Sequence, residues 1–263
     1  MSSSPFISIV TVVYNDEKEI EATLKSVFDQ SLQDYELIVI DGKSTDDTVA
    51  IIQRYANQIH HFVSEKDKGI YDAMNKGIEC ANGEWIYFLN AGDRFYAKDM
   101  LEQLKTLHKD CDLVYGSNEA DYGYFKRINQ PLAMGLLDRG MIFSHQAMVV
   151  KTQWMKQFPY NLKYRFSADF DFIYGRHRAG ITFQKCDLVF ASLKADGTSE
   201  QNLLKTHNER WNVIADYSFP FFKRVTLYSW YTIESVKIIL KKIIKAILPQ
   251  KTVHKLTIRK YQK

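Results

Sequence analysis

Apolar positions in the first part of the chain follow two alternating patterns. Short runs rich in β-branched and aromatic residues have the length of buried strands, and between them apolar residues such as Ile20, Leu24 and Val27 recur at helical spacing. The runs predict strands over residues 6–14, 36–40, 60–64, 85–89 and 111–116, with helices within 15–30, 41–56, 68–81 and 99–108. This alternation predicts an α/β fold, with a Rossmann-like, mostly parallel sheet and helices on both faces.

Beyond residue 117 the pattern loosens. It predicts a strand or hairpin arm over 121–128, an apolar strand within 141–150, a loop entering a helix over 162–180, and one or two late strands within 181–199. A parallel half followed by a mixed half is typical of a nucleotide-binding half, here 1–117, joined to an acceptor-binding half, here 118–202. Together they make a predicted catalytic domain over 1–202.

Composition indicates the class of protein and its cellular compartment. An apolar fraction of 46% is ordinary for a globular domain, and no stretch reaches the roughly 18 uninterrupted apolar residues of a spanning helix. The start, MSSSPFISIV, lacks the basic region and the long apolar run of a signal peptide. Cys80, Cys111 and Cys186 are odd in number and lack metal-ligand spacing, which is typical of free thiols in a reducing compartment. These features predict a cytoplasmic protein.

Charge is distributed unevenly along the chain. From Phe221 to Lys263, eleven Lys or Arg accompany a single acid, Glu234, a net charge of +10, so the first 220 residues carry −6 of the overall +4. A uniformly basic nucleic-acid-binding protein would not be divided in this way, so no nucleic-acid partner is expected. Residues 203–263 are predicted to form a separate, basic and helical extension.

The extension contains an amphipathic stretch. One helical face carries the aliphatic residues Ile233, Val236, Leu240, Ile243, Ile244 and Ile247. Four lysines lie largely on the opposite face: Lys237, Lys241, Lys242 and Lys245. Trp230 and Tyr231 stand at its start and Pro249 at its end. Such a helix can lie in a bilayer interface, where each lysine adds about 1 kcal/mol of attraction to an anionic leaflet. Residues from about 228 onward are predicted to bind a membrane surface; the alternative is a helix packed on the catalytic body or on a second subunit.

Polar residues follow three of the predicted strands at their carboxyl ends. The first strand gives Tyr14 and Asn15, the second gives Asp41, and the fourth gives Asn90 and Asp93. In an open parallel sheet these ends lie at one edge, where ligands bind. The alternatives are that Asn15 caps the following helix and that the aspartates only form turns.

The sequence contains neither of the two common glycine-rich phosphate cradles. No G-x-G-x-x-G follows the first strand and no G-x-x-x-x-G-K-[ST] occurs anywhere, which disfavours a dinucleotide-dependent dehydrogenase and a P-loop enzyme. If a nucleotide binds, its phosphates need another source of positive charge. A divalent cation held by Asp93, Mn²⁺ or Mg²⁺, would supply it.

Four segments carry a resemblance to a known family. In order along the chain they are SIVTVVYN (8–15), ELIVIDGKSTDDT (36–48), SEKDKGIYDAMNKG (64–77) and WIYFLNAGDRF (85–95). They resemble the consecutive motifs of the family 2 glycosyltransferases, which have the GT-A fold, and SHQAMVV and FSADFDF match more weakly. The resemblance does not cover the chain after about residue 203. It implies transfer of a sugar from a nucleotide-sugar donor with inversion at the anomeric carbon.

The resemblance also implies roles for individual residues. The nucleobase and ribose would be held by Thr11, Tyr14, Asn15 and Asp41, and Asp67 would lie close to the nucleotide. The segment Asn90–Asp93 matches the Asp-x-Asp region that binds the metal and the diphosphate. Asn90 stands where many members have an acid, so the metal site is expected to depend on Asp93.

Inverting transfer needs a base that takes the proton of the acceptor hydroxyl, a contribution of roughly 10²- to 10⁴-fold. The resemblance implies Asp169, in FSADFDF, with Ala168 in place of the usual Glu. Asp171 is the competing candidate, and the simpler interpretation is that Ser167 and Asp169 only begin a helix. His145 is expected either near the diphosphate or metal, or as a hydrogen-bonded strand histidine.

These observations predict a cytoplasmic inverting glycosyltransferase that uses a UDP-sugar with Mn²⁺ or Mg²⁺. The expected acceptor is a saccharide or a lipid-linked saccharide in bacterial capsule, O-antigen or exopolysaccharide synthesis, with the protein peripheral at the cytoplasmic face of the inner membrane; this step rests on analogy. One alternative is a nucleotidyltransferase, which would need a basic, glycine-rich loop near the first strand. The other is a non-catalytic sugar-nucleotide-binding module, which would have no use for Asp169.

Overall fold

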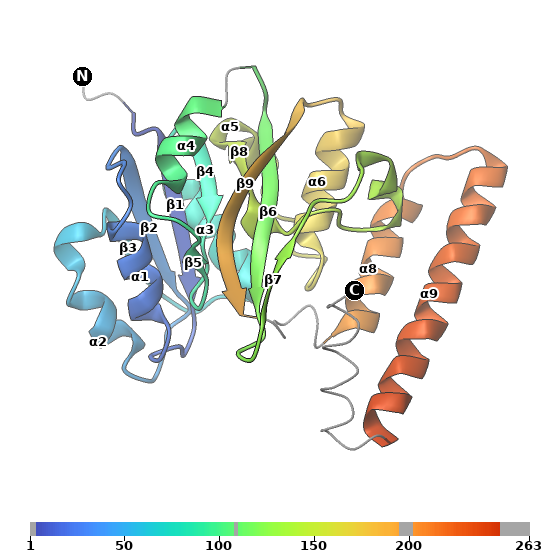
Figure 1. Cartoon of the computed structure of the whole chain (residues 1–263), viewed down its shortest axis with the longest axis horizontal. Helices are drawn as coiled ribbons and strands as arrows, with labels where there is room; N and C mark the ends of the chain where they lie inside the picture. The colour runs from blue at the N-terminus through green and yellow to red at the C-terminus, as the bar shows by residue number, and fades with distance from the viewer. Residues whose placement is uncertain (1–3, 108–109, 195–201, 248–263) are drawn as a thin grey trace.

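The computed structural model describes residues 4–107, 110–194 and 202–247, and nine strands within these residues form one sheet (Figure 1). They are β1 (Ile7–Val13), β2 (Tyr35–Asp41), β3 (His61–Ser64), β4 (Trp85–Phe88), β5 (Arg94–Phe95), β6 (Leu113–Asp121), β7 (Lys126–Asn129), β8 (Met148–Lys151) and β9 (Phe183–Lys194). Their order is β3-β2-β1-β4-β8-β6-β9-β5, with β7 paired to β6. β1 to β4 run parallel, as do β6 and β9, whereas β8 is antiparallel to β4 and β6. The predicted α/β fold with a mostly parallel sheet is confirmed.

Helices cover both faces of the sheet. They are α1 (Ile20–Phe28), α2 (Thr48–Gln53), α3 (Ile70–Cys80), α4 (Met100–Leu107), α5 (Thr152–Gln157), α6 (Ala168–Arg178), α8 (Leu203–Ala215) and α9 (Phe221–Ile247), with short 3₁₀ turns η1 (Ala56–Gln58), η2 (Met134–Arg139) and η3 (His145–Ala147). Alternate residues of β1 and β2 point into two cores, one shared with α1 and α4 and the other with α3, α5 and α6. Every residue of β1 and β2 is buried, which explains their continuous apolar runs.

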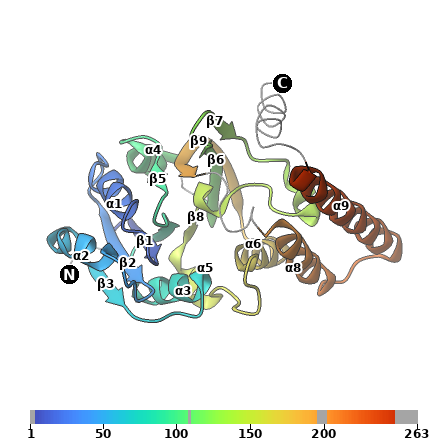
Figure 2. The ribbon, with the colours of Figure 1, turned by 90° about the horizontal axis from the view of Figure 1, so that it is seen from below.

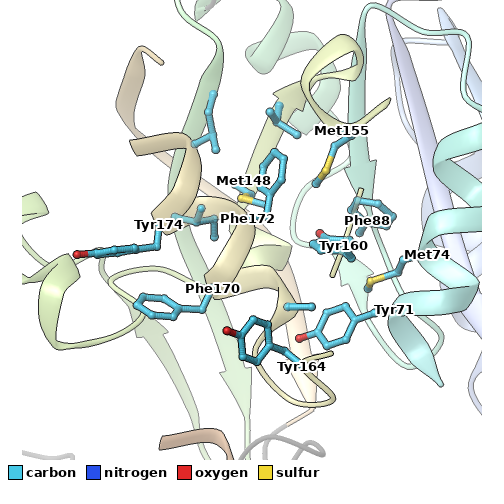
Figure 3. Close-up of a cluster of buried hydrophobic side chains, with 14 of the residues drawn as sticks. Tyr71, Met74, Phe88, Met148, Met155, Tyr160, Tyr164, Phe170, Phe172 and Tyr174 are labelled. Atoms are coloured by element: carbon cyan, nitrogen blue, oxygen red, sulfur yellow. The ribbon is translucent and has the colours of Figure 1, made fainter. Parts of the chain in front are cut away.

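The second core is rich in aromatic side chains and methionines (Figure 3). Tyr160 packs against Tyr71 of α3 and Phe88 of β4, with ring centroids 5.1 and 5.6 Å apart. Phe170 and Phe172 contribute from α6. Each such side chain stabilises the fold by about 1.5–3 kcal/mol relative to exposure. This packing holds the start of α6 beside α3, although the two helices are almost a hundred residues apart in sequence.

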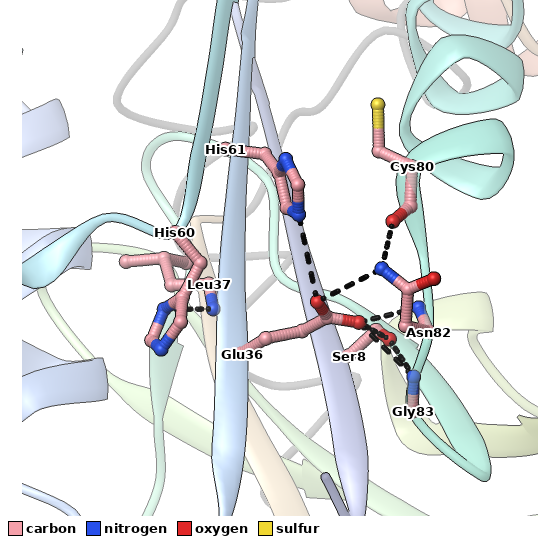
Figure 4. Close-up of polar contacts among 8 residues, drawn as sticks. All are labelled: Ser8, Glu36, Leu37, His60, His61, Cys80, Asn82 and Gly83. Carbon is pink, nitrogen blue, oxygen red and sulfur yellow. Dashed lines mark hydrogen bonds and ion pairs between the residues drawn. The ribbon is translucent and has the colours of Figure 1, made fainter. Parts of the chain in front are cut away.

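A buried carboxylate fastens the amino-terminal edge of the sheet (Figure 4). Glu36, near the start of β2, accepts hydrogen bonds from Ser8 Oγ at 2.6 Å and from the backbone amides of Asn82 and Gly83. His61 Nε2 lies 3.8 Å from its other oxygen. Burial would raise the pKa of Glu36, but these donors hold it below its usual value. The carboxylate therefore joins β1, β2 and the turn before β4.

Some elements differ from the sequence prediction. The strand expected within 141–150 begins only at Met148, because residues 145–147 form the η3 turn. β6 runs across residue 117 as far as Asp121, and strands from both predicted halves share one sheet. The expected late strand ends at Lys194; residues 195–199 lie outside the described part.

The carboxyl-terminal helices also depart from expectation. α9 begins at Phe221, directly after Pro220, and not near Trp230. Tyr231 is buried, and its carbonyl lies 2.9 Å from Nε2 of His207 in α8. α8 packs between α6 and α9 (Figure 2). Packing on the catalytic body thus covers Leu227 and Tyr231, whereas residues 221–226 at the start of α9 are exposed. Pro249 and the predicted continuation to residue 263 lie outside the described residues.

Candidate functional site

The carboxyl ends of β1 and β2 meet in a hydrogen-bonded pair of loops. Asn15 has a positive φ of 49°, which Asn tolerates, and its Oδ1 accepts a hydrogen bond from Thr45 N at 2.8 Å. Asp41 is fully buried and accepts hydrogen bonds from the backbone and hydroxyl of Ser44 and from Ser64 Oγ. Tyr14 beside them is 62% exposed. The loops therefore have a fixed shape and offer an open aromatic ring.

Asp67 is brought to the same place from the loop before α3. Its Oδ1 accepts a hydrogen bond from Gly69 N at 2.8 Å. A Cβ at Gly42 would lie 2.4 Å from Asp67 Oδ2 and 3.3 Å from the Tyr14 ring, so glycine permits this close approach. Thr11 lies inside β1, fully buried, with no hydrogen-bond partner for its Oγ1 within the described residues. The structure thus groups four of the five predicted nucleoside residues, whose roles stay predictions, and places Thr11 beneath them.

Asp93 follows β4 and is buried with few donors. Gln146 Nε2 donates to its Oδ2 at 3.2 Å, and Thr23 Oγ1 donates to its backbone carbonyl. Burial raises the pKa of Asp93 to about 7, although the charge of His145 and the bond from Gln146 act in the opposite direction. Asn90 Oδ1 is also buried and has no hydrogen-bond partner in the described part of the chain. The Asp93 carboxylate and the Asn90 side-chain oxygen are therefore incompletely satisfied by the protein.

This pair fits a hard divalent cation, though only as part of its coordination shell. Among the described residues, no group of three or more His, Cys, Asp or Glu could hold a metal. Mg²⁺ and similar ions commonly take one or two carboxylate oxygens and complete their shell with water and substrate phosphates. One carboxylate with a high pKa and one unpartnered amide oxygen match that arrangement. Asp93 and Asn90 are the residues that would hold the ion.

Asp169 lies at the start of α6 with both oxygens engaged. Its Oδ1 accepts hydrogen bonds from Tyr71 OH at 2.9 Å and from Phe170 N at 2.8 Å, and its Oδ2 lies 3.1 Å from His145 Nδ1. Burial would raise the pKa of Asp169, but its bond to His145, with smaller effects from Arg210 and Tyr71, holds it below the usual value. The carboxylate is therefore kept ionised, as a proton acceptor requires.

The competing carboxylate has a different environment. Asp171 lies on the same first turn of α6, and burial raises its pKa. Of the two carboxylates, it is that of Asp169 that pairs with His145 Nδ1 at 3.1 Å. The structure therefore favours Asp169 over Asp171 as the ionised group beside the site.

The η3 turn connects Asp93 with Asp169. His145 contacts Asp169, and the next residue, Gln146, contacts Asp93. Tyr87 OH donates to the Gln146 carbonyl at 2.8 Å, and Ser144 Oγ donates to its side-chain oxygen, which fixes the turn. An ionised carboxylate and an incompletely satisfied one, linked through a single turn, form an arrangement that can serve transfer of a group from a diphosphate to a hydroxyl.

Two contributors were missed by the sequence analysis, Tyr71 and Gln146. Both lie within segments that carried the family resemblance, KGIYDAMNKG and SHQAM. Their contacts join residues 98 and 53 positions apart, which periodicity and spacing do not reveal. His145 is expected from sequence either near the diphosphate or metal, or as a hydrogen-bonded strand histidine. It lies in the η3 turn, its direct partner is Asp169, and its Nε2 is buried without a hydrogen-bond partner among the described residues.

Solved structures share this fold. S. aureus TarS 1-349 in complex with UDP-GlcNAc aligns with a TM-score of 0.65 and 16% identity, over 86% of this chain and 71% of that one. The mannosyltransferase PcManGT from Pyrobaculum calidifontis, in complex with GDP-Man and Mn²⁺, also aligns with a TM-score of 0.65 and 16% identity. That alignment covers 98% of this chain and 80% of PcManGT. The chain spans 42% of the longer TarS structure. At this identity the likeness establishes the GT-A fold.

Sequence comparisons establish the family. A PGL/p-HBAD biosynthesis glycosyltransferase of Mycobacterium bovis (strain BCG / Pasteur 1173P2) is 33% identical over 181 residues, 65% of this chain and 69% of that protein. The putative teichuronic acid biosynthesis glycosyltransferase TuaG of Bacillus subtilis (strain 168) is 39% identical over 102 residues, 38% and 40% of the two chains. The model of the glycosyl transferase family 2 matches residues 8–177, which include Asp93, Asp169 and the η3 turn that contacts both. The chain therefore belongs to glycosyl transferase family 2.

Proposed function

We propose that the protein transfers a sugar from a UDP-sugar to an acceptor hydroxyl with inversion at the anomeric carbon. The observation that carries this proposal is the η3 turn, which ties the ionised Asp169 to the incompletely satisfied Asp93. The TarS complex with UDP-GlcNAc supports a uridine nucleotide as donor. Inversion needs one base and no covalent sugar-enzyme intermediate, and a single ionised carboxylate suits it.

In this proposal each residue group has one task. Asp169 accepts the proton of the attacking hydroxyl, while Tyr71 and His145 hold its oxygens in place. Tyr14, Asn15, Asp41 and Asp67 shape the nucleoside pocket, with Thr11 beneath it. Asp93 and Asn90 would hold Mn²⁺ or Mg²⁺, which supplies Lewis acidity to the departing diphosphate.

The proposed acceptor is a saccharide or lipid-linked saccharide in the assembly of a bacterial surface polysaccharide. The relatives in PGL/p-HBAD and teichuronic acid biosynthesis support this class by analogy. No helix within the described residues is long and apolar enough to cross a membrane. For an acceptor with a lipid part, we propose that the protein acts at the cytoplasmic face of the membrane.

The outer half of α9 is the proposed membrane contact. From Ile239 to Ile244 every side chain is exposed, so α9 projects beyond α8 with its apolar residues uncovered. Ile243, Ile244 and Ile247 are among them, next to Lys241 and Lys242. The carboxyl end of α9 lies on the same side of the molecule as the carboxyl ends of β6 and β9 (Figure 1). This side also carries the candidate site, so a lipid-linked acceptor would reach it from the surface.

Enzymatic function is tested by UDP release from a panel of UDP-sugars, including UDP-GlcNAc, with Mn²⁺, with Mg²⁺ and with EDTA. Water serves as the acceptor in this assay. We expect release that depends on one donor and on the cation. Absence of release from every UDP-sugar, together with absence of UDP binding by calorimetry, contradicts the proposal.

The membrane contact is tested by sedimentation of the full chain with phosphatidylglycerol-containing vesicles at low salt. Lys241→Glu/Lys242→Glu should weaken binding at least about tenfold, because each lysine contributes about 1 kcal/mol. The control Lys25→Glu/Lys98→Glu makes the same charge change on the body of the protein. Equal effects of the two double variants would show non-specific attraction. A wild-type protein that ignores vesicles and dimerises would show that α9 packs on a second subunit.

A further inference from the structure

α8 holds the loop that leads into the helix of Asp169. The carboxylate of Glu209 accepts hydrogen bonds from two consecutive backbone amides, Arg165 N at 3.0 Å and Phe166 N at 2.7 Å. The next residue, Ser167, is fully buried, and its Oγ donates to the Thr206 carbonyl at 3.1 Å. Three successive loop residues are thus fixed by one helix, immediately before α6 begins.

This contact lies outside the region matched by the family model. That region ends at residue 177, and α8 begins at Leu203, in the part predicted from sequence to be a separate extension. Glu209 is forty residues from Asp169 in sequence. The amphipathic pattern of α8 gives no sign of the contact, since a half-buried glutamate on a helix is usually a solvated residue.

We propose that Glu209 is a positioning residue for the base, and that the catalytic unit of this protein extends through α8. The inference rests on the proposed function, in which Asp169 accepts the proton. Asp169 is the second residue of α6, so its carboxylate follows any shift of the loop at 165–167. A displacement of about 1 Å at a catalytic group can cost about 10²-fold in rate.

The chemistry of the contact suits positioning better than packing. A carboxylate can accept both amides at once, and charge-assisted bonds are roughly twice as strong as neutral ones. Apolar side chains already join the two helices, because Phe170 and Ile173 of α6 belong to the same core as Val213 and Ile214 of α8. Removal of Glu209 should therefore leave α8 docked while it frees the loop.

The neighbouring residue of α8 acts on the base itself. The guanidinium of Arg210 lies 5.9 Å from the Phe170 ring, and its charge helps to hold the pKa of Asp169 low. Two consecutive residues of α8 therefore fix the loop and favour the ionised base.

The test is steady-state kinetics on the full chain, with UDP release from UDP-GlcNAc, or the best donor of the panel, in the presence of Mn²⁺. Glu209→Ala should lower kcat about 10²-fold and leave the donor KM and UDP affinity within about twofold of wild type. Glu209→Gln keeps one acceptor oxygen and should recover about tenfold of that loss. Asn208→Ala, an exposed neighbour on the same helix, is the matched control and should change neither parameter.

Several outcomes would overturn the inference. Glu209→Ala with wild-type kcat excludes a positioning role. Equal losses in kcat and in UDP affinity, with a lowered thermal midpoint, assign Glu209 to folding alone. If Glu209→Ala does not fold, the kinetics of Glu209→Gln decide instead. A folded Glu209→Gln protein with wild-type kcat also excludes the positioning role. If Glu209→Ala keeps the wild-type kcat while Asp169→Asn abolishes UDP release, only the inference has failed. If wild type itself releases no UDP, the proposed function has failed first.

Discussion

Glu36 and Asp93 are both carboxylates buried in the same sheet, at opposite ends of its parallel strands. Glu36 has a hydroxyl and two backbone amides directed at it, and its pKa is lowered. Asp93 has a single amide donor on its carboxylate, and its pKa is raised to about 7. The amino-terminal edge thus satisfies its acid within the protein, whereas the carboxyl-terminal edge leaves one for a ligand. Asp169 complicates the contrast, because it has many donors, as Glu36 does, yet lies in the candidate site.

Asp169→Asn gives the largest expected effect and tests whether a well-satisfied carboxylate can be catalytic. Amide replacement removes the proton acceptor, so kcat for UDP release should fall about 10²- to 10⁴-fold. UDP affinity should remain near wild type, because a base acts in the transition state and not on the bound donor. Calorimetry with UDP provides the second measurement. Loss of UDP binding with normal turnover of the residual complex would instead make Asp169 a binding residue and return Asp171 to consideration.

Asp93→Asn should separate activity from stability. We expect cation-dependent UDP release to fall about 10²- to 10³-fold, as for loss of a group that stabilises developing charge. The folded-state pKa of Asp93 is raised, so its favourable contribution is present below pH 4 and is lost as the pH rises through about 7. In EDTA at pH 8 the variant should therefore be more stable than wild type, by up to about 4 kcal/mol. Urea denaturation at pH 5 and pH 8 measures this, and a destabilised variant at pH 8 would contradict the raised pKa.

Glu36→Gln, at the amino-terminal edge of the sheet, should lower stability and leave activity unchanged. Its pKa is lowered in the folded state, so its contribution is present above the unfolded value and is lost as the pH falls through the folded one. Removing the charge from this network should destabilise the fold by about 2–3 kcal/mol at pH 7. UDP release per folded molecule should not change. A loss of kcat at constant KM would mean that the two edges are coupled and that the contrast between them is too simple.

Gly83→Ala gives the smallest expected effect and probes the same edge without a change of charge. A Cβ at residue 83 would lie 2.5 Å from the backbone nitrogen of Ser8 and 2.8 Å from its hydroxyl. We expect destabilisation of about 1–3 kcal/mol from this overpacking, with normal kinetics. Gly123→Ala is an informative comparison, because open space surrounds that position and only its φ of +80° is strained. Equal effects of the two substitutions would mean that the Ser8 contact relaxes at little cost.

The sequence by itself determined the parallel sheet, the positions of the strand ends and the amphipathic character of α9. It did so because the period of apolar residues records which face of each element is buried, and this is a local property. The continuous apolar runs of β1 and β2 predicted strands covered on both faces, and the polar residues after them predicted the ligand edge. The family motifs then added Asp93 and Asp169 as candidates.

Only the tertiary structure decided which of these groups meet. The contacts of Tyr71 with Asp169, of Gln146 with Asp93, and of Glu209 with the loop before α6 span 98, 53 and 43–44 residues of chain. The structure also buries Leu227 and Tyr231 of α9 and leaves the helix exposed both over 221–226 and over 239–244. Periodicity states that a face is buried but not what covers it, because the partner is chosen by the packing of side chains from distant segments into one close-packed interior.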